Sequence, residues 1–450
     1  MTALFARRAL LPYGWANDVR LEWSGSGTLT RVVVGGASDE AEHAELVLPG
    51  MPNLHSHAFQ RALAGRTEHA GEDPDSFWTW RDLMYRFARV ISPPQLEAIA
   101  AQLYVECLRH GYTSVCEFHY LHRDPAGAFY PRIAETAERT IAAARATGIG
   151  ITMLPVLYSW AGFGEQPLAP EQQRFRTSAD EVLRIVEALE PARDGQLEIG
   201  VAPHSLRAAS LAQVARVVAA MPPGRPLHIH IAEQVGEVEQ SLAFSGQRPV
   251  RWLMDHVDVD QRWCLVHATH LDDEEVAALA KSGAVAGLCP TTEANLGDGL
   301  FPLQRYLDHG GRIGIGSDSH VSQSPVEELR WLEYGQRLVQ RRRNIAQTGE
   351  TRQVGDVLWQ QALVGGAQAA GRPVGALRVG ERADVIVLDD AHPAVAGADT
   401  SELLGRFVFC GNDNLVKHVL VGGGWVVRDR AHVDGDAIAE RYRRVLTELR

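Results

Sequence analysis

Residues 48–60 read LPGMPNLHSHAFQ, a short apolar run that ends in His55, Ser56 and His57. Three later apolar runs also end in polar residues. RPLHIHIAEQ (225–234) carries His230, WCLVHATH (263–270) carries His267, and IGIGSDSH (313–320) carries Asp318. In a barrel of parallel strands, the carboxyl ends of the strands meet at one mouth, where barrel enzymes keep their catalytic residues. This order therefore predicts one enzymatic site built from the ends of several strands.

The residue types at these positions are those of a metal centre. A divalent ion needs ligands that bind while neutral or anionic, and His55, His57, His230 and Asp318 are such residues. Side chains alternate along a strand, so the single intervening Ser56 lets both neighbouring histidines face one ion. An HxH pair alone is weak evidence, because histidines at strand ends are often only hydrogen-bonded polar residues. The whole ordered set predicts one bound divalent metal ion.

The lysine content narrows the kind of metal site. Lys281 and Lys417 are the only lysines in the sequence, and neither ends a predicted strand. A pair of ions bridged by a carbamylated lysine is therefore disfavoured, and a one-metal site is expected. Zinc is the ion expected from the nitrogen and oxygen ligands, with iron, manganese and cobalt as alternatives.

Strand-like segments alternate with amphipathic stretches through most of the chain. The predicted strands cover residues 46–54, 113–118, 148–156, 197–202, 226–231, 263–266, 284–289 and 311–316. Apolar residues at helical spacing predict helices over residues 92–111, 179–191, 210–221, 272–283 and 325–340. Eight alternations of strand and helix predict an α/β fold, a (β/α)8 TIM-type barrel.

The two ends of the chain are also β-rich. Strand patterns occur before residue 47 and again in GERADVIVLDD (380–390) and NLVKHVLVGGGWVVRD (414–429). We expect residues 1–47 and 375–450, the latter with a terminal helix, to form one small β-sandwich without catalytic residues. Residues 48–374 would then form the metal-dependent hydrolase barrel.

Composition and charge exclude several classes of protein. Hydrophobic residues are 45% and charged residues 22%, and the net charge is −12, which argues against a nucleic-acid partner. The sequence has no apolar run that could span a bilayer and no convincing secretory signal, so a cytoplasmic protein is expected. Cysteines 107, 116, 264, 289 and 410 form no CxxC pair and are expected to be buried thiols.

The order HxH, HxAE, H and D resembles the amidohydrolase superfamily over essentially the whole chain, and its deaminase branch fits best. HIAEQ (230–234) places Glu233 three residues after His230, where related deaminases keep a carboxylate that carries a proton from the attacking water to the leaving amine. The resemblance implies that His267 polarises the water or the substrate. It also implies that Asp318, besides binding the metal, helps to ionise the water. Without the resemblance, Glu233 could be a solvated helix-start residue and His267 a buried core histidine.

Further segments are similar to the formimidoylglutamate deiminases of this superfamily. They are NLHSHAFQRALAGRTE (53–68), FWTWRDLMYRF (77–87), CEFHYLH (116–122), APHSLRA (202–208), CPTTEANLGDGLFPL (289–303) and GSDSHVSQSPVEELRWLEYGQRL (316–338). The resemblance implies hydrolysis of a C–N bond in a linear amidine. The reaction would convert N-formimino-L-glutamate to N-formyl-L-glutamate and ammonia, in histidine degradation.

Such a substrate is a small anionic molecule that needs cations around its carboxylates. Arg81, after the first predicted strand, and Arg207, just beyond the fourth, can hold carboxylates by paired planar hydrogen bonds. Ser322 and Ser324 are further candidates, and the sequence does not choose between them. The resemblance implies substrate contacts for five residues: Gln60, Arg81, Tyr120, His204 and Arg207.

Two alternatives stay open at this point. One is a purine, pterin or S-adenosylhomocysteine deaminase on the same scaffold, which would need aromatic stacking and amide contacts instead of two arginines. The other is a catalytically inactive relative that serves in assembly or binding, which the complete set of metal-binding and proton-handling residues disfavours. A homodimer is expected from the superfamily, and nothing in the chain fixes its interface.

Overall fold

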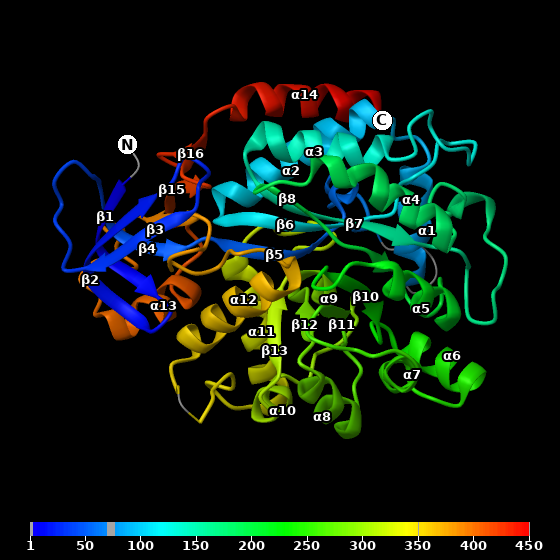
Figure 1. Cartoon of the computed structure of the whole chain (residues 1–450). Helices are drawn as coiled ribbons and strands as arrows, with labels where there is room; N and C mark the ends of the chain where they lie inside the picture. Colours follow the sequence, from blue (N-terminus) through cyan, green and yellow to red (C-terminus); the bar gives the residue numbers. More distant parts are fainter. Residues whose placement is uncertain (1–2, 70–76, 350, 450) are drawn as a thin grey trace.

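The computed structural model describes residues 3–69, 77–349 and 351–449. Its strands fall into two groups, which lie side by side in Figure 1. One group, here called the terminal sheet, joins strands from both ends of the chain. The other, here called the parallel core, contains the central strands with helices packed around them. No helix among the described residues is both long and apolar enough to cross a membrane.

The parallel core consists of two parallel sheets. One has the order β5, β6, β7 and β8 with β9 beside β7, and the other has the order β10, β11, β12 and β13. Parallel bridges from Ser56 to Asp318 and from Val201 to Leu227 link the two sheets. The strands are β5 (Met51–Ser56), β6 (Tyr112–His119), β7 (Gly150–Leu157), β8 (Leu197–Ile199), β9 (Ala202–Pro203), β10 (Leu227–Ile231), β11 (Trp263–His267), β12 (Val285–Leu288) and β13 (Arg312–Ile315).

The predicted strands match the parallel core except at two places. The strand expected over residues 46–54 is two strands, because the chain turns at Gly50 from β4 (Glu42–Pro49) into β5. β4 pairs with the terminal sheet, whereas β5 pairs with β6. A side chain at position 50 would collide with Thr113, so only glycine fits at this crossing. The strand expected over residues 197–202 is likewise divided, into β8 and β9.

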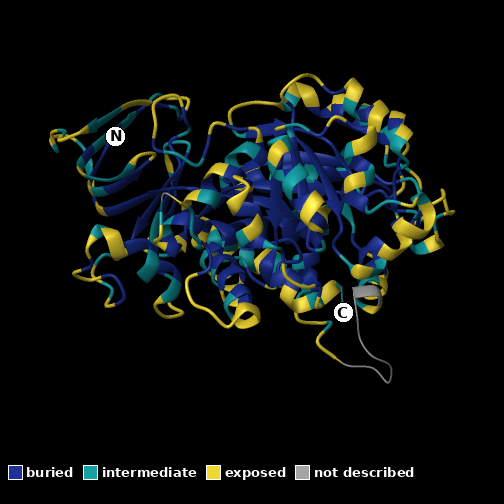
Figure 2. Cartoon of the chain, turned by 90° about the horizontal axis from the view of Figure 1, so that it is seen from below, coloured by how far each residue is buried: buried dark blue, intermediate teal, exposed yellow. Residues whose placement is uncertain are grey.

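Helices surround the parallel core, and the five predicted helices are confirmed. In Figure 2 the interior strands are buried, and the outer turns of the helices are exposed. The helices are α1 (Phe77–Ala88), α2 (Pro93–Arg109), α3 (Glu135–Thr147), α4 (Ala179–Leu189), α5 (Leu211–Ala220), α6 (Val235–Ser245), α7 (Pro249–His256), α8 (Asp273–Ser282), α9 (Pro290–Leu296), α10 (Leu303–Asp308), α11 (Pro325–Gln340), α12 (Val354–Ala370), α13 (Thr400–Phe409) and α14 (Gly435–Glu448).

Helix α12 covers the amino ends of the parallel core. It packs against β5, β12 and β13, and its glycines allow this approach because a side chain at Gly365 would overlap the Ile313 carbonyl. Its last turn binds the strands directly, since Thr152 Oγ1 donates a hydrogen bond to the Ala370 carbonyl over 2.7 Å. The amino ends are therefore closed by a helix, and the carboxyl ends remain for a site.

The terminal sheet has eight strands in the order β17, β16, β15, β14, β4, β1, β2 and β3. The parallel pairing of β1 with β4 and the antiparallel pairing of β4 with β14 join the two ends of the chain in one sheet. The remaining strands are β1 (Ala3–Leu11), β2 (Gly14–Trp23), β3 (Leu29–Val34), β14 (Val385–Leu388), β15 (Val416–Val421), β16 (Gly424–Arg428) and β17 (Ala431–His432).

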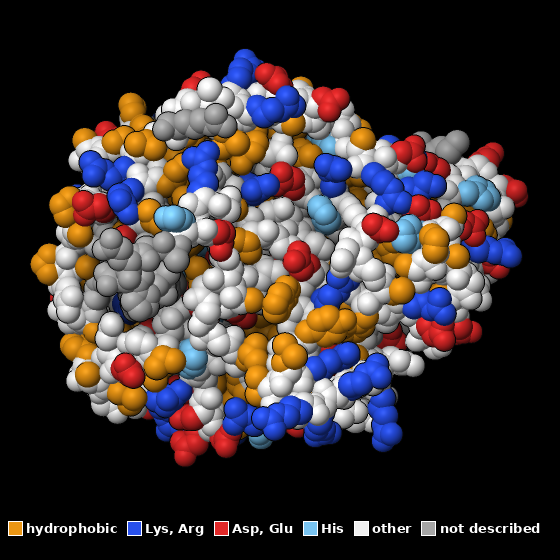
Figure 3. All heavy atoms as spheres, turned by 180° about the vertical axis from the view of Figure 1, so that it is seen from behind, with side chains coloured by type: hydrophobic (Ala, Val, Ile, Leu, Met, Phe, Trp, Pro, Cys, Tyr) orange, Lys and Arg blue, Asp and Glu red, His pale blue; other side chains and the backbone are white. Residues whose placement is uncertain are grey.

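The cysteines differ in their exposure, and the surface carries charges of both signs. Four cysteines are buried and reduced as expected, but Cys410 is exposed, because it follows α13 at the molecular surface. Basic and acidic side chains occur side by side over most of the face shown in Figure 3. The arginines of the segment 341–343 are exposed in a turn after α11.

Candidate metal centre and active site

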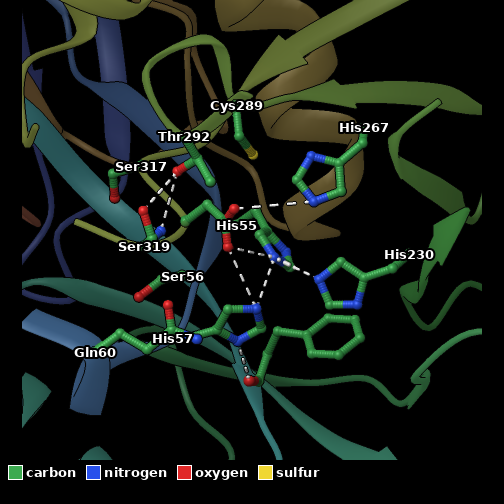
Figure 4. Close-up of polar contacts among 12 residues, drawn as sticks. His55, Ser56, His57, Gln60, His230, His267, Cys289, Thr292, Ser317 and Ser319 are labelled. Carbon is green, nitrogen blue, oxygen red and sulfur yellow. Dashed lines mark hydrogen bonds and ion pairs between the residues drawn. The ribbon is translucent and has the colours of Figure 1, made fainter. Parts of the chain in front are cut away.

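Four buried side chains from three strands converge at the carboxyl ends of the parallel core (Figure 4). His55 Nε2 lies 3.1 Å from His57 Nε2 and 3.0 Å from His230 Nε2. Asp318 Oδ1 lies 3.3 Å from His55 Nε2 and 3.4 Å from His57 Nε2. The structure therefore brings together the whole predicted ligand set.

These separations fit the ligand sphere of one small cation. Tetrahedral bonds of about 2.0–2.1 Å place the ligand atoms about 3.3 Å apart, close to the distances between these nitrogens and the carboxylate. Burial lowers the pKa of His57 and lowers that of His55 to about 3, so both imidazoles are neutral. Lone pairs of neutral imidazoles that face one another cannot all be satisfied by hydrogen bonds among themselves. A cation between them satisfies all of them at once.

The surrounding backbone selects the tautomer that metal binding requires. His57 Nδ1 donates a hydrogen bond to the Phe118 carbonyl over 2.9 Å, and His230 Nδ1 donates to the His204 carbonyl over 3.1 Å. With the proton on Nδ1, each Nε2 presents a lone pair to the centre. The carbonyls of the neighbouring strands thus orient two of the four candidate ligands.

Backbone strain is concentrated at this end of the core. His267 has a φ of 67°, Asp318 of 44° and His320 of 64°, all in the left-handed region that such residues rarely adopt. Each such residue costs on the order of 1–3 kcal/mol, and such strain clusters at functional sites. Here it turns the chain sharply after β11 and β13, so that His267 and Asp318 face the cluster.

Glu233 and His267, for which proton transfer is predicted, lie beside the four candidate ligands, here called the metal cluster. His267 Nε2 is 3.6 Å from Glu233 Oε1 and 3.9 Å from Asp318 Oδ2. Burial raises the pKa of Glu233 above its ordinary value, so this carboxyl group can hold or release a proton near neutral pH. Although burial opposes it, the hydrogen bond to His55 keeps the pKa of Asp318 below its ordinary value. Asp318 is therefore an anion, as a metal ligand should be.

A buried cavity opens beside these groups and contains the predicted substrate-binding residues. Gln60, Arg81, Tyr120, His204 and Arg207 all line it, together with His57, His230, Glu233, His267 and Asp318. Gln60 Nε2 donates a hydrogen bond to the Tyr120 hydroxyl over 2.8 Å, which ties the end of β5 to the end of β6. Strand ends and the segments that follow them bring four of the candidates to the same cavity as the metal cluster, and helix α1 brings Arg81.

The cavity is lined by charges of both signs. Arg81 and Arg207 supply positive charge near Tyr158, whereas Asp318 belongs to the metal cluster and Glu233 is a further carboxyl group of the lining. Although burial opposes it, the nearby carboxylates of Glu237 and Glu233 raise the pKa of Arg207, which keeps this guanidinium charged. The arrangement suits a molecule with carboxylates at one end and a reacting, basic group at the other.

Some sequence candidates have other roles. Ser322 Oγ donates to Glu327, and Ser324 Oγ caps α11 by accepting from Glu327 N over 3.4 Å. Neither serine lines the described cavity, so the expectation that one of them reaches the site is not supported. Both hydroxyls instead make hydrogen bonds at the N-terminus of α11.

Comparisons with known proteins agree with this geometry. The model described as "Amidohydrolase family" matches residues 46–426. The chain belongs to the amidohydrolase family. A second model, "Formimidoylglutamate deiminase HutF, N-terminal domain", matches residues 1–44. The family match thus covers the parallel core and continues into the terminal sheet.

Individual amidohydrolase relatives span the whole chain. It is 54% identical over 451 residues to a formimidoylglutamate deiminase of Pseudomonas aeruginosa, covering 100% of both proteins. It is 26% identical over 437 residues to a 5-methylthioadenosine/S-adenosylhomocysteine deaminase of Natronomonas pharaonis, covering 95% of this chain and 92% of that protein. A solved amidohydrolase of Brucella melitensis is 43% identical and superposes with a TM-score of 0.95, covering 100% of both chains.

The sequence analysis did not predict a buried hydrogen-bond network that holds the HxH segment. Glu117 Oε2 accepts from Ser56 Oγ over 2.6 Å, and Glu117 Oε1 accepts from Ala58 N over 2.7 Å. His320 Nε2 accepts from the backbone nitrogen of His57 over 3.2 Å. These contacts hold the HxH segment from both sides. Glu117 lies in the segment CEFHYLH, and its place at a strand end was the one available signal.

Sequence reasoning also missed several residues that line the cavity. Tyr85 and Tyr158 place their hydroxyl oxygens 3.1 Å apart, and Gln172 Nε2 donates to the Tyr158 hydroxyl over 2.9 Å. The segment FWTWRDLMYRF indicated the region of Tyr85, but no motif pointed to Tyr158. The other missed lining residues are Trp80, Met84, Phe175 and Leu296.

Proposed function

We propose that this chain hydrolyses N-formimino-L-glutamate to N-formyl-L-glutamate and ammonia. The observation that carries the proposal is one cavity that joins Arg81 and Arg207 to the metal cluster and to Glu233. The relative of Pseudomonas aeruginosa named formimidoylglutamate deiminase, 54% identical over its full length, supports the same substrate. The reaction breaks a C–N bond of a linear amidine, as part of histidine degradation.

The charges of the substrate match the charges that line the cavity. Its two carboxylates need cations, and an arginine fork binds a carboxylate through two parallel hydrogen bonds. Arg81 and Arg207 are therefore assigned to the carboxylates, with Gln60, Tyr120 and His204 as further polar contacts. The formimino group is basic like a guanidine, and it would face Glu233 and Asp318.

The metal would be held by His55, His57, His230 and Asp318, which converge at the required spacing. Zinc suits this set of nitrogen and oxygen ligands, and iron, manganese or cobalt could occupy the same site. A bound divalent ion lowers the pKa of a coordinated water toward 7 and so supplies the nucleophile at neutral pH. An adenosine deaminase of Xanthomonas campestris with bound zinc has the same fold at 21% identity and a TM-score of 0.81.

The residues of the chain would carry the protons of the reaction. Water adds to the formimino carbon, which forms a C–O bond, and the terminal C–N bond then breaks. Both protons of the water end on the terminal nitrogen, which leaves as ammonia. Glu233 lies between the cluster and the cavity and would pass these protons one at a time. His267 and Asp318, 3.9 Å apart, would orient the water and stabilise the developing charge.

The finer features of the architecture belong to the same proposal. We infer that the two parallel sheets, linked by bridges on both sides, form a closed (β/α)8 barrel over residues 48–374. Residues 1–47 and 375–450 would form the accompanying β-sandwich. A cytoplasmic homodimer without nucleic-acid or membrane partners is also proposed, and analytical ultracentrifugation of the purified protein tests the dimer.

Ammonia release by metal-quantified protein tests the activity. N-formimino-L-glutamate would be compared at equal concentration with guanine, adenosine and S-adenosylhomocysteine. We expect rapid release from the formimino compound alone. Release from a purine compound alone would overturn the substrate assignment while leaving the amidohydrolase chemistry intact. No release from any compound with a full complement of metal would favour an inactive relative.

A further inference from the structure

The segment CPTTEANLGDGLFPL (289–303) contributes two buried carboxyl groups to the site that have no role in the reaction described above. It follows β12 and contains α9. Glu293 and Asp298 are each 4% exposed, and both lie near the proton-handling residues Glu233 and His267. Two buried acids beside two other titratable groups require a physical explanation, because unpaired buried carboxylates are costly.

Glu293 is fixed against His267. Its Oε1 accepts a hydrogen bond from the backbone nitrogen of Cys289 over 2.9 Å, and the same oxygen lies 3.3 Å from His267 Nδ1. The backbone contact holds the carboxylate in place, so the carboxylate can accept a hydrogen bond from His267 Nδ1. His267 Nε2 then faces Glu233 and Asp318 at 3.6 Å and 3.9 Å. Glu293 therefore determines the orientation of this ring and keeps a proton on its Nδ1.

Asp298 is fixed against Glu233. Its backbone nitrogen donates to the Glu293 carbonyl over 2.9 Å, and its Oδ1 accepts from Gln234 Nε2. Its Oδ2 is buried and has no hydrogen-bond partner among the described residues. One carboxylate oxygen each of Asp298 and Glu233 and a ring nitrogen of His267 lie within 4.8 Å of one another. Two carboxyl groups this close cannot both ionise freely.

We propose that Glu293 and Asp298 are positioning residues that act through His267 and Glu233. Glu293 holds the His267 ring by its Nδ1 proton. Asp298 lies close enough to Glu233 that the two carboxyl groups do not both ionise, and one proton stays on the pair. Burial, with the Glu233 charge, raises the pKa of Asp298 above its ordinary value, which agrees with one proton on the pair. The segment 289–303 thus controls the orientation of His267 and the protonation of Glu233, the two groups that the proposed reaction uses for proton transfer. This inference rests on the proposed function.

Glu293→Gln tests the contact with His267. The amide keeps the size of the side chain and can still accept from Cys289 N, but it has no charge. We expect kcat to fall about 10- to 100-fold while KM changes less than about twofold. In proton NMR spectra, the hydrogen-bonded Nδ1 proton of His267, assigned by its loss in His267→Asn, should move upfield. An unchanged kcat, or a lower kcat with an unmoved Nδ1 signal, would overturn the role of Glu293.

Asp298→Asn tests the effect of Asp298 on the protonation of Glu233. The charged neighbours of the pair are His267, Glu293, Glu237, Asp318 and Arg207. All of them remain in this variant, so only the pair changes. Without the second carboxyl group, Glu233 loses its proton and becomes able to accept one from the water at lower pH, so the acidic limb of the pH profile of kcat should move to lower pH by about one unit. An unmoved limb would overturn the role of Asp298.

Glu328→Gln is the matched control. Glu328 is a fully buried glutamate of α11 that holds the same segment, since it accepts from Thr291 N over 2.9 Å and from Thr291 Oγ1 over 2.6 Å. It should lower Tm without moving the pH profile or the His267 signal. If it reproduced the effects of the other two variants, loosening of the segment would explain them and the proposal would be wrong. Failure of wild-type protein to deiminate the substrate would instead refute the proposed function, and the NMR measurement would still test Glu293.

Discussion

His228 and His230 stand two residues apart on β10 and on the same face of the strand, yet they lie in opposite surroundings. His230 Nδ1 donates to the His204 carbonyl, and its Nε2 points at the metal cluster. His228 Nε2 donates to the Ala369 carbonyl in the last turn of α12 over 2.8 Å. Burial lowers the pKa of both histidines, so both are neutral. The two histidines therefore differ in the group that faces Nε2. The other candidate metal ligands face this nitrogen in His230, and a helix carbonyl faces it in His228.

The comparison shows how position along a strand separates catalysis from stability. At the amino ends of the parallel core, α12 closes the interior, and carbonyls of its last turn accept hydrogen bonds from His228 and Thr152. At the carboxyl ends, backbone carbonyls take the Nδ1 protons and leave lone pairs and carboxylates facing a cavity. Position along the strand therefore places one histidine of this pair at the candidate metal site and the other in a buried contact with α12.

Replacement of His230 should have the largest effect. We expect His230→Ala to lose most of its bound metal and at least about 1000-fold in kcat/KM, because one of four ligands is gone. Metal analysis and ammonia release measure the two effects. His228→Leu is the control on the same strand and should keep full metal content. Equal metal loss in both variants would contradict the distinction between the two ends of β10.

Glu233→Gln should separate proton transfer from metal binding at the carboxyl ends. The amide keeps the shape of the side chain but cannot carry a proton, so kcat should fall about 100- to 10,000-fold with the metal retained. Glu239→Gln, an exposed change on the next helix, is the control. A nearly wild-type rate in Glu233→Gln would remove this residue from the proposed mechanism.

Arg207→Met should weaken substrate binding more than turnover. In the proposed complex this buried guanidinium binds a carboxylate of the substrate. Its loss should raise KM about 10- to 100-fold, with a much smaller change in kcat. Arg216→Met changes an exposed arginine that pairs with Asp180 on the surface, and its kinetics should equal those of the wild type. An unchanged KM in Arg207→Met would argue against a dicarboxylate pocket at this place.

The ligand set and most strands could be predicted because both depend on local patterns. Apolar runs that end in His55, His57, His230, His267 and Asp318 indicate buried strands and the one edge where they end. Parallel strands then bring these ends together whatever the intervening loops do. The five substrate-binding candidates followed from the family resemblance, since nothing in local spacing distinguishes Arg207 from the many other arginines.

The missed residues depend on contacts that no local pattern specifies. Tyr158 follows a strand without a ligand-like neighbour, and Glu293 and Asp298 enter the site through the path of the loop after β12. In the sequence Glu117 resembles any other strand residue. Only the structure shows that its carboxylate accepts hydrogen bonds from three donors. The division of residues 46–54 into β4 and β5 likewise depends on the crossing at Gly50, where Thr113 excludes a side chain.

The smallest expected effect comes from the sealed end of β10. His228→Leu removes the donor to Ala369 and should cost about 1–3 kcal/mol of unfolding free energy at pH 7.5, with activity and metal content retained. Burial lowers the pKa of His228 from 6.5 to about 4, so the folded state resists protonation that the unfolded state accepts. Stability linked to this histidine is therefore present above pH 6.5 and lost as the pH falls toward 4.

That loss can amount to as much as about 3 kcal/mol, because each unit of pKa shift corresponds to about 1.4 kcal/mol. Leucine has no proton to bind, so Tm of the variant should fall less steeply than that of the wild type between pH 6.5 and 4. The other buried histidines are common to both proteins and cancel in the difference. Parallel Tm curves over this range would mean that His228 is protonated in the folded state, and the amino ends of the core would not be sealed as the contact with α12 indicates.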